Sequence, residues 1–164
     1  MKAVVFDMDG VIFDSESLVI ETWQEVAKRH HIEKIEEVCM KCLGTKAAAS
    51  KTIFKNAYGE DFPYDDYKAE MAVLFHERAA GGKLRQKPGI KELLAYLREK
   101  GIKTAVASST RREIVLRELE EGGLLSWFDR IVCGDMVTRS KPEPDIFLKA
   151  CELLEVEPKD AYAL

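Results

Sequence analysis

Val4-Val5-Phe6-Asp7-Met8-Asp9-Gly10-Val11 is the stretch of sequence that decides the fold. Its β-favouring apolar residues predict a buried strand, which two acidic residues and a turn-forming glycine follow directly. Asp7 and Asp9 therefore stand at the C-terminal end of a strand, the edge of an open α/β sheet at which ligands bind. Two carboxylates this close repel unless a cation lies between them or one keeps a proton, so they suit metal binding or acid–base chemistry. An ordinary surface turn is the alternative.

Length, charge and hydropathy restrict the functions that are open to this chain. Its 164 residues are enough for one core with a small inserted subdomain. A net charge of −4 without a dense run of Lys or Arg argues against nucleic acid and favours a small-molecule partner. No apolar run approaches the roughly 20 residues that span a bilayer, and Met1-Lys2 leads into the strand without a secretory signal pattern. We therefore expect no membrane contact and a cytoplasmic location.

The four cysteines are open to more than one interpretation. Cys39 and Cys42 form a C-x-x-C pattern, which is found in redox pairs and in half-sites for zinc. No matching second pair and no suitably spaced histidine completes a zinc site. Cys133 and Cys151 fall among apolar residues. A role as small core residues is therefore favoured for Cys133 and Cys151, and neither a redox nor a zinc role is favoured for Cys39 and Cys42.

The middle of the chain is predicted to be a helical insertion. Apolar residues recur at helical spacing from about Ser17 to Gly82, with breaks at Gly44-Thr45 and from Tyr58-Gly59 to Pro63. This block separates two parts of an α/β pattern, so we expect it to form a subdomain of its own. The predicted division is a core of residues 1–14 and 84–164 and a helical cap of residues 15–83.

The second half of the chain alternates helices with strands, which is the pattern of a parallel sheet covered by helices. The stripe Ile90, Leu93, Leu94 and Leu97 predicts a helix that covers such a sheet. We therefore expect an α/β fold. The strands expected after the first are Ile102 to Ala107, Phe128 to Cys133 and Ala161 to Leu164.

Two polar segments follow the later strands. Ser108 comes directly after a strand, and Thr110-Arg111-Arg112-Glu113 matches a capping box, so the loop leads into a helix N-terminus that would suit a phosphate. Lys141 follows the next strand, and Pro142 and Pro144 restrict the backbone beside it, which would hold its cation in one place. Taken singly, a loop serine without a ligand and a solvated lysine are the alternatives.

Together these segments resemble the first three motifs of the haloacid dehalogenase (HAD) superfamily. Asp7-Met8-Asp9-Gly10-Val11, Ser108 and Lys141-Pro142-Glu143-Pro144-Asp145 agree with them in order, separation and strand placement. The helical insertion is similar to the cap of the β-phosphoglucomutase-like branch. The resemblance covers essentially the whole chain and implies a three-layer Rossmann-like parallel sheet core with an inserted helical cap.

The resemblance implies Mg²⁺-dependent hydrolysis of a small sugar or organic phosphate. Asp7 would attack phosphorus to form an aspartyl-phosphate, and Asp9 would protonate the leaving oxygen and then activate water. Ser108 and Lys141 would bind the phosphoryl group. Mg²⁺ would bridge Asp7, the backbone carbonyl of Asp9 and a phosphoryl oxygen.

A sugar-phosphate mutase is the alternative within the same branch. Such mutases carry a His early in the first cap helix and an Arg in a cap loop, where this chain has Val19 and Ala47. A phosphatase is therefore favoured. Gly44-Thr45-Lys46 resembles the substrate-facing loop of the cap, which makes Gly44 and Lys46 candidate specificity residues.

The fourth motif of the superfamily would follow Ala161 to Leu164. It is a strand that ends in acidic residues, which complete the Mg²⁺ shell. We therefore expect either a fragment of a longer chain or a sheet edge that another molecule covers, with self-association through that edge as one outcome. Weakened Mg²⁺ binding and a non-catalytic phosphate-binding role are the corresponding expectations for function.

Overall fold

The computed structural model describes residues 1–43, 47–139 and 141–164, and within it the chain divides into two compact units. One unit, called the core here, consists of Met1–Asp14 and Gly81–Leu164. The other, called the cap, consists of Ser15–Ala80. Each unit has its own cluster of buried apolar side chains and is described by itself.

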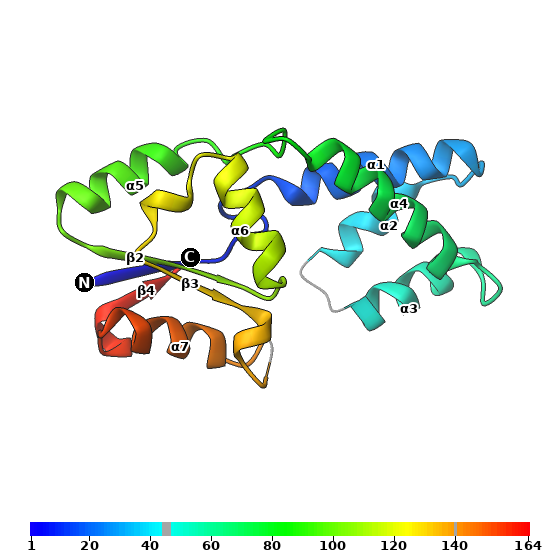
Figure 1. Ribbon diagram of the computed structural model, residues 1–164. Helices are drawn as coiled ribbons and strands as arrows, with labels where there is room; N and C mark the ends of the chain where they lie inside the picture. Colours follow the sequence, from blue (N-terminus) through cyan, green and yellow to red (C-terminus); the bar gives the residue numbers. More distant parts are fainter. Residues whose placement is uncertain (44–46, 140) are drawn as a thin grey trace. The chain divides into compact units, whose positions relative to one another are not determined.

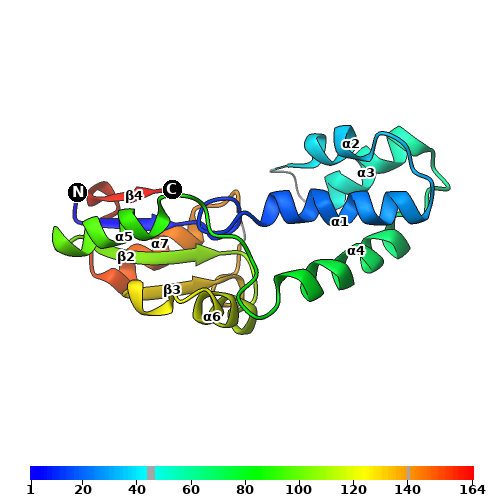
Figure 2. The ribbon, with the colours of Figure 1, turned by 90° about the horizontal axis from the view of Figure 1, so that it is seen from above.

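The core is built on a four-stranded parallel sheet with the strand order β3-β2-β1-β4 (Figure 2). All four residues of β1 are buried, as expected for an apolar strand inside a parallel sheet that is covered on both faces. Each strand lies within two residues of its expected bounds, and the predicted α/β fold is confirmed. The strands are β1 (Ala3–Phe6), β2 (Lys103–Ser108), β3 (Arg130–Cys133) and β4 (Ala161–Ala163).

Helices cover both faces of the sheet and give the core three layers (Figure 1). Helices α5 (Ile90–Glu99) and α6 (Arg112–Glu121) lie on one face, and α7 (Asp145–Leu154) lies on the other. Three residues of the predicted stripe are buried in α5, whereas Leu93 is 37% exposed. Full burial of a leucine or isoleucine side chain contributes about 1.5–3 kcal/mol to folding. Short 3-10 helices span Leu125–Trp127, Gly134–Met136 and Pro158–Asp160.

The register of the sheet brings the C-terminal ends of its strands to one edge. Phe6 pairs with Val106, and Ser108 pairs with Cys133. On the other side of β1, the Asp7 N–H donates to the Leu164 carbonyl at 2.8 Å, which extends the pairing with β4. β4 is an edge strand, and self-association through it stays a prediction.

The described residues of the cap form four helices around an aromatic centre. The ring of Trp23 lies 4.6 Å from that of Phe54, which lies 5.0 Å from that of Tyr64, and all three side chains are buried. No helix of the described residues is long and apolar enough to cross a membrane. The helices are α1 (Ser15–Arg29), α2 (Ile35–Cys42), α3 (Ala47–Tyr58) and α4 (Tyr64–Ala79).

All four cysteines are free thiols, and three of them are buried. Burial raises the pKa of Cys39 to about 12 and that of Cys133 to about 11, and it also raises the pKa values of Cys42 and Cys151. The thiolate is the form that reacts and that binds metals, so these side chains are poor nucleophiles at neutral pH. These findings agree with the packing role that the sequence favours for Cys133 and Cys151.

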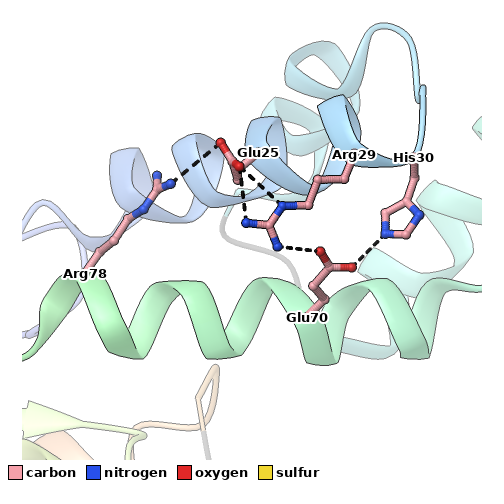
Figure 3. Close-up of polar contacts among 5 residues, drawn as sticks. All are labelled: Glu25, Arg29, His30, Glu70 and Arg78. Carbon is pink, nitrogen blue, oxygen red and sulfur yellow. Dashed lines mark hydrogen bonds and ion pairs between the residues drawn. The ribbon is translucent and has the colours of Figure 1, made fainter.

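A chain of ion pairs joins α1 to α4 on the surface of the cap (Figure 3). The Glu70 carboxylate accepts a hydrogen bond from the Arg29 guanidinium at 2.9 Å and lies 2.7 Å from His30 Nε2. Glu25 bridges Arg29 at 3.2 Å and Arg78 at 3.8 Å. The hydrogen bond with His30, followed by that with Arg29, lowers the pKa of Glu70.

We expect Glu70→Gln to lower the melting temperature by a few degrees at pH 7. Because the pKa of Glu70 is lowered in the folded state, its contribution to stability is present above its ordinary value of 4.5 and is lost as the pH falls through the folded value. The difference between wild type and variant should therefore shrink below pH 4.5. Thermal unfolding from pH 7 to pH 3 measures it, with the exposed Glu77→Gln on the same helix as control. A pH-independent difference would contradict the prediction.

Candidate active site

The predicted acid Asp7 and the predicted cation Lys141 are in direct contact at the sheet edge. Asp7 follows the last residue of β1, and its Oδ1 lies 2.7 Å from Lys141 Nζ. The same oxygen accepts a hydrogen bond from the Met8 N–H at 2.7 Å. Lys141 Nζ also donates to the Ala107 carbonyl in β2 at 3.0 Å and lies 5.0 Å from the centre of the Phe147 ring. These contacts fix the ammonium group between the ends of β1 and β2.

Ser108 is the last residue of β2 and is fully buried. Its Oγ accepts a hydrogen bond from the Thr110 N–H at 3.1 Å. The predicted capping box at Thr110 is wrong, because α6 begins one residue later with Arg111 as its cap, and no side chain caps it. The hydrogen bond from the Thr110 N–H to the Ser108 hydroxyl closes a tight turn between these two residues.

Gly134 places the end of β3 directly against the loop that follows Ser108. A Cβ atom at Gly134 would lie 2.2 Å from the Ser109 carbonyl oxygen, a distance that no real side chain can adopt. The Gly134 N–H donates to the Thr110 carbonyl at 3.1 Å. The position of the Ser108 loop therefore depends on a glycine in the neighbouring strand connection.

Asp9, the second predicted acid, is exposed in the turn after β1. Gly10 adopts a φ of 75°, a conformation that glycine accepts without strain, and its N–H donates to the Phe13 carbonyl at 2.9 Å. The N–H of Ile12 donates to the Met8 carbonyl at 3.0 Å. These bonds close the turn and keep Asp9 at the same strand end as Asp7.

Glu118 is an acidic residue of this region that sequence reasoning missed. Its burial in α6, followed by the charge of Asp9, raises its pKa to about 7. The residue stands in the charged run Arg117-Glu118-Leu119-Glu120-Glu121, which is typical of a solvated helix face. Helical spacing is a weak signal for it in the sequence, because Glu118 lies three residues after the buried Val115 and therefore on the same side of α6.

The predicted specificity residues cannot be placed. Gly44 and Lys46 lie outside the described residues. Val19, at the position where mutases carry a histidine, is a half-buried residue of α1 that packs against the aromatic centre of the cap. Ala47 is the first residue of α3.

The donor set at the strand end is compatible with a magnesium ion. Mg²⁺ prefers oxygen ligands and is usually held by one or two carboxylates together with waters and substrate phosphate. Asp7 and Asp9 are oxygen donors of this kind. No group of three or more His, Cys, Asp or Glu side chains that could hold a metal exists among residues 1–43, 47–139 and 141–164. Asp7 and Asp9 supply the one or two carboxylates that Mg²⁺ usually takes from a protein.

Comparison with known proteins identifies the family. Residues 4–163 match the model of the haloacid dehalogenase-like hydrolases. The chain is 33% identical to a phosphorylated carbohydrates phosphatase of Thermotoga maritima, over 97% of this chain and 73% of the relative. It is 32% identical to the β-phosphoglucomutase of Bacillus subtilis, over 100% of this chain and 74% of that enzyme. The crystal structure of CbbY from Rhodobacter sphaeroides with phosphate matches with a TM-score of 0.67 and 27% identity, covering 99% and 76% of the two chains.

The chain therefore belongs to the haloacid dehalogenase-like hydrolases, as the sequence motifs predicted. It is an enzyme of the phosphatase and phosphoglucomutase kind within that family. The individual roles predicted for Asp7, Asp9, Ser108 and Lys141 stay predictions.

We expect Gly134→Ala to destabilise the protein by about 1–3 kcal/mol, because the new methyl group forces the backbone at Ser109 to move. The same movement should displace Ser108 and weaken phosphate binding. Urea unfolding and calorimetric titration with inorganic phosphate measure the two effects. Thr138→Ala, an exposed residue of the same connection, is the control. Wild-type stability in the glycine variant would refute the close approach.

We expect Glu118→Gln to stabilise the metal-free protein above pH 7 by about 1–2 kcal/mol after allowance for solvent screening. The folded state holds the Glu118 proton up to about pH 7, whereas the unfolded state releases it near 4.5, so wild-type stability falls with rising pH between these values. Below pH 4 the two proteins should be equally stable. Urea unfolding in EDTA tests this, with the exposed Glu120→Gln as control. An advantage of the same size at every pH would contradict it.

Proposed function

We propose that this chain is a Mg²⁺-dependent phosphomonoester hydrolase that acts on a small sugar or organic phosphate through an aspartyl-phosphate at Asp7. The observation that carries this proposal is the 2.7 Å contact of Asp7 with Lys141, at a sheet edge that also ends in Ser108. A relative named for phosphorylated carbohydrates and a structural neighbour that holds phosphate support the substrate class.

Asp7 is the nucleophile in this proposal, and its carboxylate is held on one side. Its Oδ1 contacts both the Met8 N–H and Lys141, which restrains rotation of the carboxylate. In the first step a carboxylate oxygen of Asp7 forms a bond to phosphorus and the bond to the leaving oxygen breaks. Bound Mg²⁺ would neutralise charge on the phosphoryl group. Lys141 acts on the same charge, because its ammonium is fixed beside the attacking group.

Asp9 supplies the proton transfers. In the first step it gives its proton to the leaving oxygen. In the second it accepts a proton from the water that attacks phosphorus, and the bond between phosphorus and Asp7 breaks to release inorganic phosphate. Its exposure at the strand end keeps it accessible to both the leaving group and water.

Ser108 binds the transferred group with its hydroxyl hydrogen. Its Oγ already accepts the Thr110 N–H, so the hydroxyl keeps its own hydrogen for a phosphoryl oxygen. Because the side chain is buried, this donor is held in one direction.

A β-phosphoglucomutase-type mutase is the second candidate. The 32% identity to such an enzyme favours it. A mutase of this branch would need a protonatable side chain where the cap has Val19, and valine cannot supply one. This residue makes hydrolysis the preferred reaction.

We expect Asp7→Asn to lower kcat for hydrolysis of p-nitrophenyl phosphate and of sugar phosphates by about 10³-fold or more. Asp9→Asn should lower it by about 10²–10⁴-fold, the usual contribution of a general acid and base. Activity should disappear in EDTA and return with Mg²⁺. Asp66→Asn, an exposed acid in the cap, serves as the control and should leave turnover unchanged.

Three outcomes would contradict the proposal. Turnover that survives in the Asp7 variant would exclude the aspartyl-phosphate. A folded wild-type protein that binds phosphate but turns over no ester would establish the non-catalytic phosphate-binding role instead. Conversion of β-glucose 1-phosphate to glucose 6-phosphate without release of phosphate would favour the mutase.

A further inference from the structure

The last residue of α6 and the two glycines after it, Glu121–Gly123, are called the α6 end here and contact the chain beside the points where it passes between the two units. The chain leaves the core for the cap between Asp14 and Ser15, called the first crossing. It returns to the core between Ala80 and Gly81, called the second crossing. Glu121 Oε2 accepts hydrogen bonds from two successive backbone N–H groups after the second crossing. These are the N–H of Gly81 at 3.0 Å and the N–H of Gly82 at 3.2 Å.

The backbone of the α6 end also lies close to Gly82. A Cβ atom at Gly82 would lie 2.7 Å from the Glu121 carbonyl oxygen, and the φ of Gly82 is +75°. Any other residue would therefore both clash and be strained. The segment after the second crossing fits the α6 end only because it begins with glycines.

The first crossing meets the same helix end. A Cβ atom at Gly122 would lie 3.2 Å from the Phe13 ring, and the Gly122 carbonyl accepts a hydrogen bond from Gln86 Nε2 at 2.6 Å. The segments beside the two crossings also pair with each other. The Asp14 N–H donates to the Arg85 carbonyl at 2.7 Å, and Lys87 Nζ lies 2.8 Å from Asp14 Oδ1.

We propose that Glu121 is a positioning residue that fixes the second crossing, with the α6 end acting as a shared anchor for both connections to the cap. All of the contacts that carry this proposal lie within the core. The other end of α6 follows the loop of Ser108, so one helix of about 15 Å connects the anchor with the phosphate loop. The effect of Glu121 on turnover rests on the proposed function, whereas its effect on the crossing does not.

Amide hydrogen exchange at Gly81 and Gly82 tests the anchor directly. In Glu121→Ala we expect these two amides to exchange about tenfold faster, which corresponds to about 1.4 kcal/mol. Glu121→Gln should restore slow exchange, because its carbonyl oxygen can accept the same hydrogen bonds. The neighbouring exposed Glu120→Ala should behave as wild type. Exchange of the Val106 amide in the central sheet should stay unchanged, which separates local release from global unfolding.

Unchanged exchange at Gly81 and Gly82 in Glu121→Ala would overturn the anchor. Gln86→Ala, which removes a different contact of the α6 end, should increase exchange beside the crossings to a smaller extent. Trypsin cleavage after Lys83 should also accelerate in Glu121→Ala and return to the wild-type rate in Glu121→Gln. If Glu121→Ala and Glu121→Gln show the same exchange and cleavage rates, residue 121 does not act through hydrogen bonds to the Gly81 and Gly82 N–H groups. The proposal then fails.

Steady-state kinetics test the positioning role. With glucose 6-phosphate as probe, Glu121→Ala should raise KM about threefold to tenfold, with a smaller change in kcat, and Glu121→Gln should restore KM. Faster exchange with an unchanged KM would overturn the positioning role. Faster exchange in a protein whose wild type turns over no phosphate ester would refute the proposed function and still support the anchor.

Discussion

The ion pair between Asp7 and Lys141 is the interaction on which the arrangement of the candidate site depends. It joins the end of β1 to the connection before α7, and the hydrogen bond of Lys141 to Ala107 includes β2 in the same contact. The two side chains are 32% and 24% exposed, and ion pairs this accessible usually contribute about 0–1 kcal/mol to stability. The pair therefore matters mainly for position. It holds a cation and a carboxylate together at the point where three strands end.

That position exists only because the sheet has one register. Phe6 pairs with Val106 and Ser108 pairs with Cys133, so the residues that follow each strand emerge side by side. Side chains alternate between the faces of a sheet, and a slip of one residue would send every side chain of a strand to the opposite face. A slip of β1 would also move Lys2 or Asp7, which flank its four buried apolar residues, into a buried position, and this cost fixes the direction in which Asp7 leaves the sheet.

The sequence was informative wherever a feature depends on neighbouring residues. The strand before Asp7, the polar residues at strand ends and the proline-flanked Lys141 are all local patterns, and each was found near its predicted place. The capping box failed because a second local group, the Ser108 hydroxyl, competes for the Thr110 N–H. Glu118 was missed because helical spacing places it beside the buried Val115 but does not show how strongly packing of the helix buries its carboxyl group.

This protein positions its chain in two ways, by steric contact and by charged groups. At Gly134 and Gly82 a backbone carbonyl oxygen of another segment lies where a Cβ atom would be, and at Gly122 the Phe13 ring lies tightly against that position, so these approaches depend on shape. Lys141 and Glu121 act differently, because their charged groups bind specific partners: Lys141 contacts the Asp7 carboxylate, and Glu121 accepts the Gly81 N–H. Salt screens exposed charges, with a Debye length of about 8 Å under physiological conditions, but it does not alter steric contact. The glycines therefore determine where the Ser108 loop and the crossings lie. The charged side chains restrain the orientation of the groups that they contact.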